Sequence, residues 1–116
     1  MTRTIIALVD DMFFASRIRA TAEALGVSVS FPRSKEALIE KLTESQPALV
    51  LIDLHNQRLD PLETAKEIKA LEQGIPLLGF FSHVEVELQR NALSAGFDRV
   101  IPRSVFSSDL ADILTS

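Results

Sequence analysis

Five side chains that can bind metal ions or phosphoryl groups each follow a short apolar run. Three are the carboxylates of Asp10, Asp11 and Asp53, and the other two are the hydroxyl of Ser82 and the guanidinium of Arg103. Carboxylates that crowd together repel one another unless a cation joins them, and such oxygen ligands favour Mg²⁺. A hydroxyl and a positive charge opposite them would hold the oxygens of a phosphoryl group. The pattern predicts a site that places a phosphoryl group on a carboxylate.

The apolar runs themselves have the pattern of strands in a parallel sheet. The run Ala48 to Ile52 leads unbroken into Asp53, which is typical of a strand buried on both faces. A second stretch, Val27–Phe31, alternates apolar and polar residues and predicts a strand at the edge of the sheet. The predicted strands are Ile5–Val9, Val27–Phe31, Ala48–Asp53, Ile75–Phe81 and Val100–Ile101.

A helix is predicted after each strand, because apolar residues recur there with helical spacing. Asp60 followed by Pro61 is a typical helix start, and Gly26 and Gly96 are typical helix ends. Alternating strands and helices predict an α/β fold in a single domain, residues 1–116. The predicted helices are Met12–Leu25, Lys35–Glu44, Pro61–Leu71, Val84–Ala95 and a last one starting at Ser107–Asp109.

The composition excludes several classes of function. A formal net charge of -4 without a clustered basic face argues against direct nucleic-acid binding. The chain has no cysteine, which excludes disulfides, thiolate metal sites and thiol catalysis. The first apolar run is too short for a membrane span and lacks the build of a signal peptide. A cytoplasmic protein without membrane contact is therefore expected.

Across its whole length, the chain resembles the receiver domain of two-component response regulators. The pair Asp10–Asp11 matches the family's metal-binding acids, Asp53 its phosphoacceptor and Ser82 its switch hydroxyl. The resemblance implies that the backbone carbonyl of His55 also binds the Mg²⁺ ion. It further implies a flavodoxin-like (βα)5 three-layer sandwich, with a parallel five-stranded sheet in the order 2-1-3-4-5.

Several positions depart from the family's pattern. The usual lysine after the fifth strand falls on Arg103, whose planar guanidinium does not replace an ammonium conservatively. The family's Met-Pro after the phosphoacceptor is Asn56-Gln57 here. The small residue after the switch hydroxyl is His83, and the aromatic switch position of the fifth strand is Val100. Altered phosphorylation kinetics, or signalling through protein contacts alone, would follow from these changes.

Each of these residues also has a purely structural explanation. The pair Asp10–Asp11 would cap the first helix, and Ser82 would cap a helix that starts at Val84. Arg103 would be an ordinary surface residue, matched to the lysine only by register. His55 and His83 would be exposed loop residues rather than ligands.

The favoured function is that of an atypical receiver in phosphorelay signalling. Asp53 would accept a phosphoryl group from a histidine kinase, a phosphotransfer protein or a small donor, with Mg²⁺ offsetting the charge. No enzymatic activity is expected beyond self-phosphorylation and dephosphorylation on Asp53. Output would pass to a separate effector protein, unless the chain is one domain of a longer protein. A homodimer through the fourth helix, fifth strand and fifth helix is possible.

Two other classes remain open from the sequence. A pseudo-receiver of the same fold would act as a protein-interaction module without phosphorylation, which the change to Arg103 and the bulk of His83 favour. The sequence gives less support to a third class, a metal-dependent phosphohydrolase with an aspartate nucleophile. Such enzymes usually carry a second acid two residues after the nucleophile, and this position is His55.

Overall fold

A computed structural model describes residues 3–56, 58–82 and 85–116. Its centre is a parallel sheet of five strands in the order β2-β1-β3-β4-β5, as expected. The short strand β2 lies at one edge, also as expected. The strands are β1 (Thr4–Leu8), β2 (Ser28–Ser30), β3 (Leu49–Asp53), β4 (Leu77–Phe81) and β5 (Arg99–Pro102).

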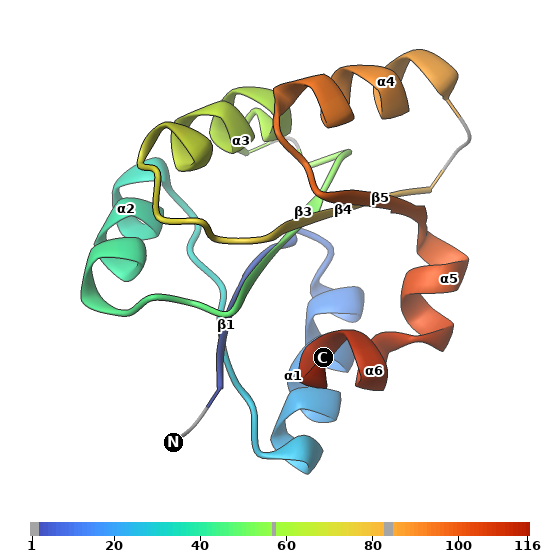
Figure 1. Cartoon of the computed structure of the whole chain (residues 1–116). Coiled ribbons are helices and arrows are strands. Elements are labelled where there is room, and N and C mark those ends of the chain that lie inside the picture. Colours follow the sequence, from blue (N-terminus) through green and yellow to red (C-terminus); the bar gives the residue numbers. More distant parts are fainter. Residues whose placement is uncertain (1–2, 57, 83–84) are drawn as a thin grey trace.

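Helices cover both faces of this sheet, so the fold is the predicted three-layer α/β sandwich. Figure 1 shows α2, α3 and α4 on one face and α1, α5 and α6 on the other. The helices are α1 (Met12–Leu25), α2 (Lys35–Glu44), α3 (Pro61–Ala70), α4 (Val86–Ala95), α5 (Arg103–Ser108) and α6 (Leu110–Thr115).

The central strands supply side chains to two separate apolar cores. In β1, Ile6 and Leu8 join the core under α2, α3 and α4. Ile5 and Ala7 point the other way and join the core under α1, α5 and α6. These four side chains are almost completely buried, which explains the unbroken apolar run in the sequence. Burial on both faces makes the central strands a rigid support for the residues at their ends.

The predicted last helix starting at Ser107–Asp109 is confirmed as α6, with Asp109 in its N-cap position, but the short helix α5 before it was not predicted. The chain enters α5 already at Arg103, directly after Pro102, whose extended backbone (φ -65°, ψ 149°) ends β5. Asp109 separates α5 from α6, yet its N–H donates to the Val105 carbonyl and its carbonyl accepts from Ile113. The two short helices therefore follow one another closely, and Arg103 stands at a helix start. The expected start of the fourth helix at Val84 lies outside the described residues.

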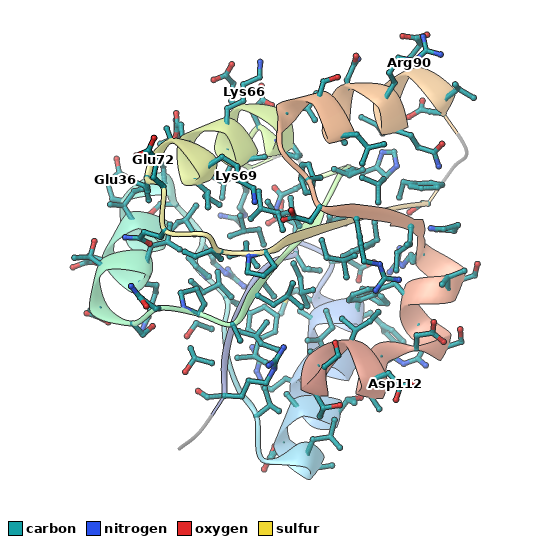
Figure 2. All side chains as sticks on the ribbon, viewed as in Figure 1. Glu36, Lys66, Lys69, Glu72, Arg90 and Asp112 are labelled. Atoms are coloured by element: carbon teal, nitrogen blue, oxygen red, sulfur yellow. The ribbon has the colours of Figure 1, made fainter. Side chains whose placement is uncertain are left out.

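Because all five strands are parallel, their carboxyl ends lie at the same edge of the sheet. Leu8 of β1 pairs with Ile52 of β3, and Asp53 pairs with Phe80 of β4. In open α/β sheets, ligands bind beyond this edge. Charged side chains on the outer helix surfaces, such as Lys66, Arg90 and Asp112, point away from it (Figure 2). No helix in the described ranges is both long and apolar enough to cross a lipid bilayer.

Candidate functional site

Asp53 is the buried carboxylate of the site. It ends β3 and is only 9% exposed, and its Oδ1 accepts a hydrogen bond from the backbone N–H of His55 at 2.9 Å. Burial is the largest effect and raises the pKa of Asp53, although the His55 N–H opposes it. The charge of Arg103 also lowers this pKa, whereas the charge of Asp11 raises it. Asp53 is thus a desolvated carboxylate within the electrostatic reach of both residues.

The loop after Asp53 is built around the side chain of Asn56, which is 8% exposed. Its Nδ2 donates to the carbonyl of Leu8 at 3.1 Å, and so ties this loop to the end of β1. Its Oδ1 accepts the backbone N–H groups of Arg58 (2.8 Å) and Leu59 (3.1 Å). The sequence marks Asn56 only as a departure from the family's pattern. The available signal was that asparagine readily bonds to backbone two or three residues ahead.

Asp10 faces an arginine that sequence reasoning did not single out. Its Oδ1 lies 3.1 Å from Nε of Arg58, and about a third of the Asp10 side chain is exposed. Arg58 belongs to the loop between β3 and α3, whereas Asp10 belongs to the short link between β1 and α1. The ion pair therefore links the two strand ends that also flank Asp53.

Asp11 makes two different contacts with its two carboxylate oxygens. Oδ1 accepts the backbone N–H of Phe14 at 3.0 Å, so the predicted helix-capping role is confirmed. Oδ2 accepts a hydrogen bond from Nη2 of Arg103 at 2.9 Å. The bond from Arg103 and then the Phe14 N–H hold the pKa of Asp11 below its ordinary value. Capping and ion pairing leave both oxygens of Asp11 engaged.

Arg103 belongs to the site and does not extend freely into solvent, since only 34% of its side chain is exposed. Its guanidinium carbon lies 4.2 Å from the centre of the Phe14 ring, in cation–π geometry. Phe14 in turn packs against Phe80 and Phe106, which stack on each other at 4.5 Å. Within the described part of the chain, the ion-pair partner of Arg103 is Asp11 rather than Asp53.

Ser82 lies at the end of β4, on the strand next to that of Asp53, and it is exposed. The structural explanation of Ser82 as a helix cap is wrong. Helix α4 begins at Val86 with Glu85 in the N-cap position, and among the described residues no side chain caps it by a hydrogen bond. His83 lies outside the described residues. Ser82 is therefore left without a capping role, at the edge where the other site residues gather.

The oxygen donors of Asp10, Asp11 and Asp53 have the chemistry that Mg²⁺ prefers. Nevertheless, residues 3–56, 58–82 and 85–116 contain no group of three or more acidic, histidine or cysteine side chains placed to hold a metal ion. Instead, Asp10 is paired with Arg58 and Asp11 with Arg103. The donor set fits a hard divalent cation, and in this structure two guanidinium groups stand beside it.

Comparison with known proteins identifies relatives among bacterial regulators. The family model of the response regulator receiver domain matches residues 6–115. Transcriptional regulatory protein ZraR of Escherichia coli K12 is 32% identical over 92 residues, which are 79% of this chain and 21% of ZraR. Response regulator protein VraR of Staphylococcus saprophyticus is 29% identical over 82 residues, 71% of this chain and 39% of VraR. The chain spans about a fifth of ZraR and two fifths of VraR.

Solved structures resemble the whole chain. A CheY-like receiver domain protein from Methanospirillum hungatei superposes with a TM-score of 0.83 at 19% identity, covering 97% of this chain and 90% of its own. A response regulator protein from Burkholderia pseudomallei superposes with a TM-score of 0.81 at 15% identity, covering 98% and 67%. That structure carries a phosphorylated aspartic acid and a calcium ion. At these identities, the likeness shows the shared fold.

Proposed function

The chain belongs to the response regulator receiver domain family of two-component systems, and we propose that its Asp53 accepts a phosphoryl group. One observation carries the proposal: a carboxylate only 9% exposed ends β3, at the edge of the sheet where ligands bind in such folds. Burial without a direct ion-pair partner is costly for a carboxylate. A chemical role at this position explains why the acid is kept there.

We propose Oδ2 of Asp53 as the attacking atom, because Oδ1 already accepts the N–H of His55. In the proposed transfer, Oδ2 forms a bond to the phosphorus of a phosphohistidine or a small phosphodonor. The bond between that phosphorus and its donor atom breaks, and the donor leaves with the bonding electrons.

We propose Asp10, Asp11, Asp53 and the backbone carbonyl of His55 as the ligands of a Mg²⁺ ion. When bound, such an ion supplies positive charge beside the transferred group. The carboxylates of this set come from the ends of β1 and β3, which are neighbours in the sheet. Their oxygen chemistry supports the assignment.

Ser82 and Arg103 would hold the oxygens of the phosphoryl group on Asp53. Both stand at strand ends on the same edge of the sheet, one after β4 and one directly after β5. A hydroxyl donates one hydrogen bond, and a guanidinium can donate two in parallel to phosphoryl oxygens. The influence of Arg103 on the pKa of Asp53 supports its nearness to that carboxylate.

The receiver family is regulatory, so the proposed outcome of phosphorylation is a change in protein contacts. We propose a cytoplasmic phosphorelay in which a histidine kinase or phosphotransfer protein supplies the phosphoryl group and an effector protein responds. The face of α4, β5 and α5 is the proposed contact surface, for an effector or for a second copy of the chain. Exposed apolar side chains on α4 and α5 support this choice: Val86 (60%), Leu93 (54%) and Val105 (37%).

Amide NMR with Mg²⁺ and beryllofluoride, a mimic of the phosphoryl group, tests this function. We expect shifts around Asp53, Ser82 and α4 in the wild type, and none from beryllofluoride in Asp53→Asn. Asp112→Asn is the matched control, because Asp112 is exposed on α6, away from the site (Figure 2). If beryllofluoride leaves the wild-type spectrum unchanged, the chain is a receiver-shaped interaction module instead.

A further inference from the structure

We propose, on the basis of the function above, that Arg58 and Arg103 form an arginine clasp on the acidic pair Asp10–Asp11. A divalent cation would then bind this pair only by displacing the two guanidinium groups. Arg58 thereby becomes a positioning residue of the site, although it matched none of the site residues expected from the sequence. The clasp sets how strongly the site takes up its cation.

The clasp closes on the acidic pair from two separate segments. Nε of Arg58 lies 3.1 Å from Oδ1 of Asp10, and Nη2 of Arg103 lies 2.9 Å from Oδ2 of Asp11. Arg58 comes from the loop after β3, and Arg103 is the first residue of α5. Since the acids are adjacent in the chain and the arginines are not, the fold itself places one cation against each carboxylate.

Buried neighbours hold Arg58 in place. The Oδ1 of Asn56 accepts the backbone N–H of Arg58 at 2.8 Å, and the Nδ2 of Asn56 donates to the carbonyl of Leu8. Asn56 is 8% exposed, so these bonds are shielded from water. The backbone of Arg58 is therefore fixed relative to Leu8, the last residue of β1, close to Asp10 in the chain.

An aromatic cluster holds Arg103 in place. Its guanidinium carbon lies 4.2 Å from the centre of the Phe14 ring, and Phe14, which belongs to α1, packs against the buried rings of Phe80 and Phe106. A planar guanidinium can stack on a ring face and bond to a carboxylate at the same time. Arg103 is thus pre-set to pair with Asp11.

Competition with a divalent cation follows from the use of the carboxylate oxygens. Oδ1 of Asp11 caps α1 through the Phe14 N–H, and Oδ2 accepts the bond from Arg103. A metal ion at Oδ2 of Asp11 would meet the positive charge of the Arg103 guanidinium, so binding there favours the release of Arg103. The guanidinium groups also offset two of the three carboxylate charges, which weakens the attraction for a second cation.

The ion pairs of the clasp contribute little enough free energy for Mg²⁺ to displace the two arginines, yet enough to lower the affinity for the ion. Partly exposed ion pairs contribute between nearly nothing and about 1 kcal/mol each. Removing one arginine should therefore raise the affinity for Mg²⁺ by up to about five-fold, and removing both should raise it by up to about 25-fold. Arg103, once released, is also free to turn toward a phosphoryl group on Asp53.

Isothermal titration with Mg²⁺ alone tests the clasp, on the wild type, Arg58→Gln, Arg103→Gln and the double variant. The chain contains no Trp or Tyr, so calorimetry or amide NMR is better suited than intrinsic fluorescence. Arg19→Gln is the matched control. Arg19 lines the same small hollow as Asp10, but its guanidinium stacks on Phe31 at 4.8 Å. This control removes a nearby positive charge without removing an ion pair of the clasp. Thermal unfolding in EDTA verifies that each variant is folded.

We expect tighter Mg²⁺ binding by Arg58→Gln and Arg103→Gln, and wild-type binding by Arg19→Gln. If the clasp variants bind Mg²⁺ no better than the wild type or Arg19→Gln, the clasp is wrong, while the phosphoacceptor function stands. If none of the folded variants binds Mg²⁺, including the double variant, the clasp and the proposed metal site both fail. Beryllofluoride shifts in the wild type distinguish failure of the clasp from failure of the function.

Discussion

Arg103 donates a hydrogen bond to Asp11 at 2.9 Å, although the two residues lie 92 positions apart in the chain. This contact joins the end of β5 to the start of α1 across the edge of the sheet that holds Asp53. It gives an acid of the proposed metal site a cation from the chain itself. A metal ion that binds the proposed site therefore has to compete with the guanidinium of Arg103 for Asp11.

Replacing Arg103 by alanine should affect two ligands in opposite directions. Mg²⁺ alone should bind more tightly, because Asp11 loses its ion-pair partner. Beryllofluoride in the presence of saturating Mg²⁺ should bind more weakly, by roughly ten-fold, because a charge-assisted hydrogen bond to the phosphoryl mimic is lost. Titrations followed by amide NMR measure both effects. Parallel changes in the two affinities would contradict the proposed double role of Arg103.

Replacing Asp53 by asparagine should stabilise the fold. Burial raises the pKa of Asp53, so the ionised carboxylate is unfavourable in the folded state near neutral pH. The amide oxygen of an asparagine can still accept the N–H of His55. We expect the free energy of unfolding to rise by about 1 kcal/mol, and Tm by several degrees. Thermal unfolding by circular dichroism near pH 7 provides the measurement, with Asp112→Asn as the unchanged control; a lower Tm for Asp53→Asn would count against the desolvated state.

Removing the Asn56 side chain should destabilise the loop that carries Arg58. Asn56→Ala leaves the Leu8 carbonyl and the N–H groups of Arg58 and Leu59 without their partner. Unpaired buried polar groups of this kind cost about 1–3 kcal/mol, which lowers Tm by roughly 5–10 °C. Thermal unfolding of Asn56→Ala measures this loss. The exposed Asn91 of α4 offers Asn91→Ala as a control, and equal Tm values for the two variants would show that the loop does not depend on Asn56.

Ionised Asp98, at the opposite edge of the sheet, should make the stability of the fold depend on pH. Burial alone would raise the pKa of Asp98, but the Leu77 N–H and the Lys69 ammonium outweigh it and hold the pKa below its ordinary value. Because its pKa is lower in the folded state, Asp98 stabilises the fold at pH values above its unfolded-state pKa of about 3.9. This stabilisation is lost as the pH falls through the folded-state pKa. Asp98→Asn should therefore unfold at a lower temperature than the wild type near pH 7, and the difference should shrink below about pH 4. Unfolding curves across this range test the sign, and a difference that grows toward low pH would refute it.

The sheet was predictable because its strands carry strong local signals. The apolar runs before Asp10 and Asp53 can only be buried on both faces, and that burial fixes which strands are central. The start of the last helix was predicted correctly from Ser107–Asp109, but α5 was missed because it has only six residues and one buried apolar side chain, Phe106. In the structure Asp109 lies between two nearly continuous helices, and the preceding turn begins at Arg103.

The pairing within the site could not be read from the sequence to the same extent. Asp10, Asp11 and Arg103 were expected at one edge of the sheet, and the structure places them there. The partner of Asp10 was missed because Arg58 reaches it only through a loop shaped by the Asn56 side chain. A long-range ion pair depends on that loop geometry, which apolar periodicity does not encode.

Phosphorylation of Asp53 is the central claim, and intact-mass spectrometry tests it most directly. The chain is incubated with Mg²⁺ and acetyl phosphate, next to Asp53→Asn and Asp112→Asn. We predict one added phosphoryl group on the wild type and on Asp112→Asn, none on Asp53→Asn, and loss of the group in hydroxylamine, as expected for an acyl phosphate. An unmodified wild-type chain, or an equally modified Asp53→Asn, would contradict the assignment of Asp53 as the phosphoacceptor.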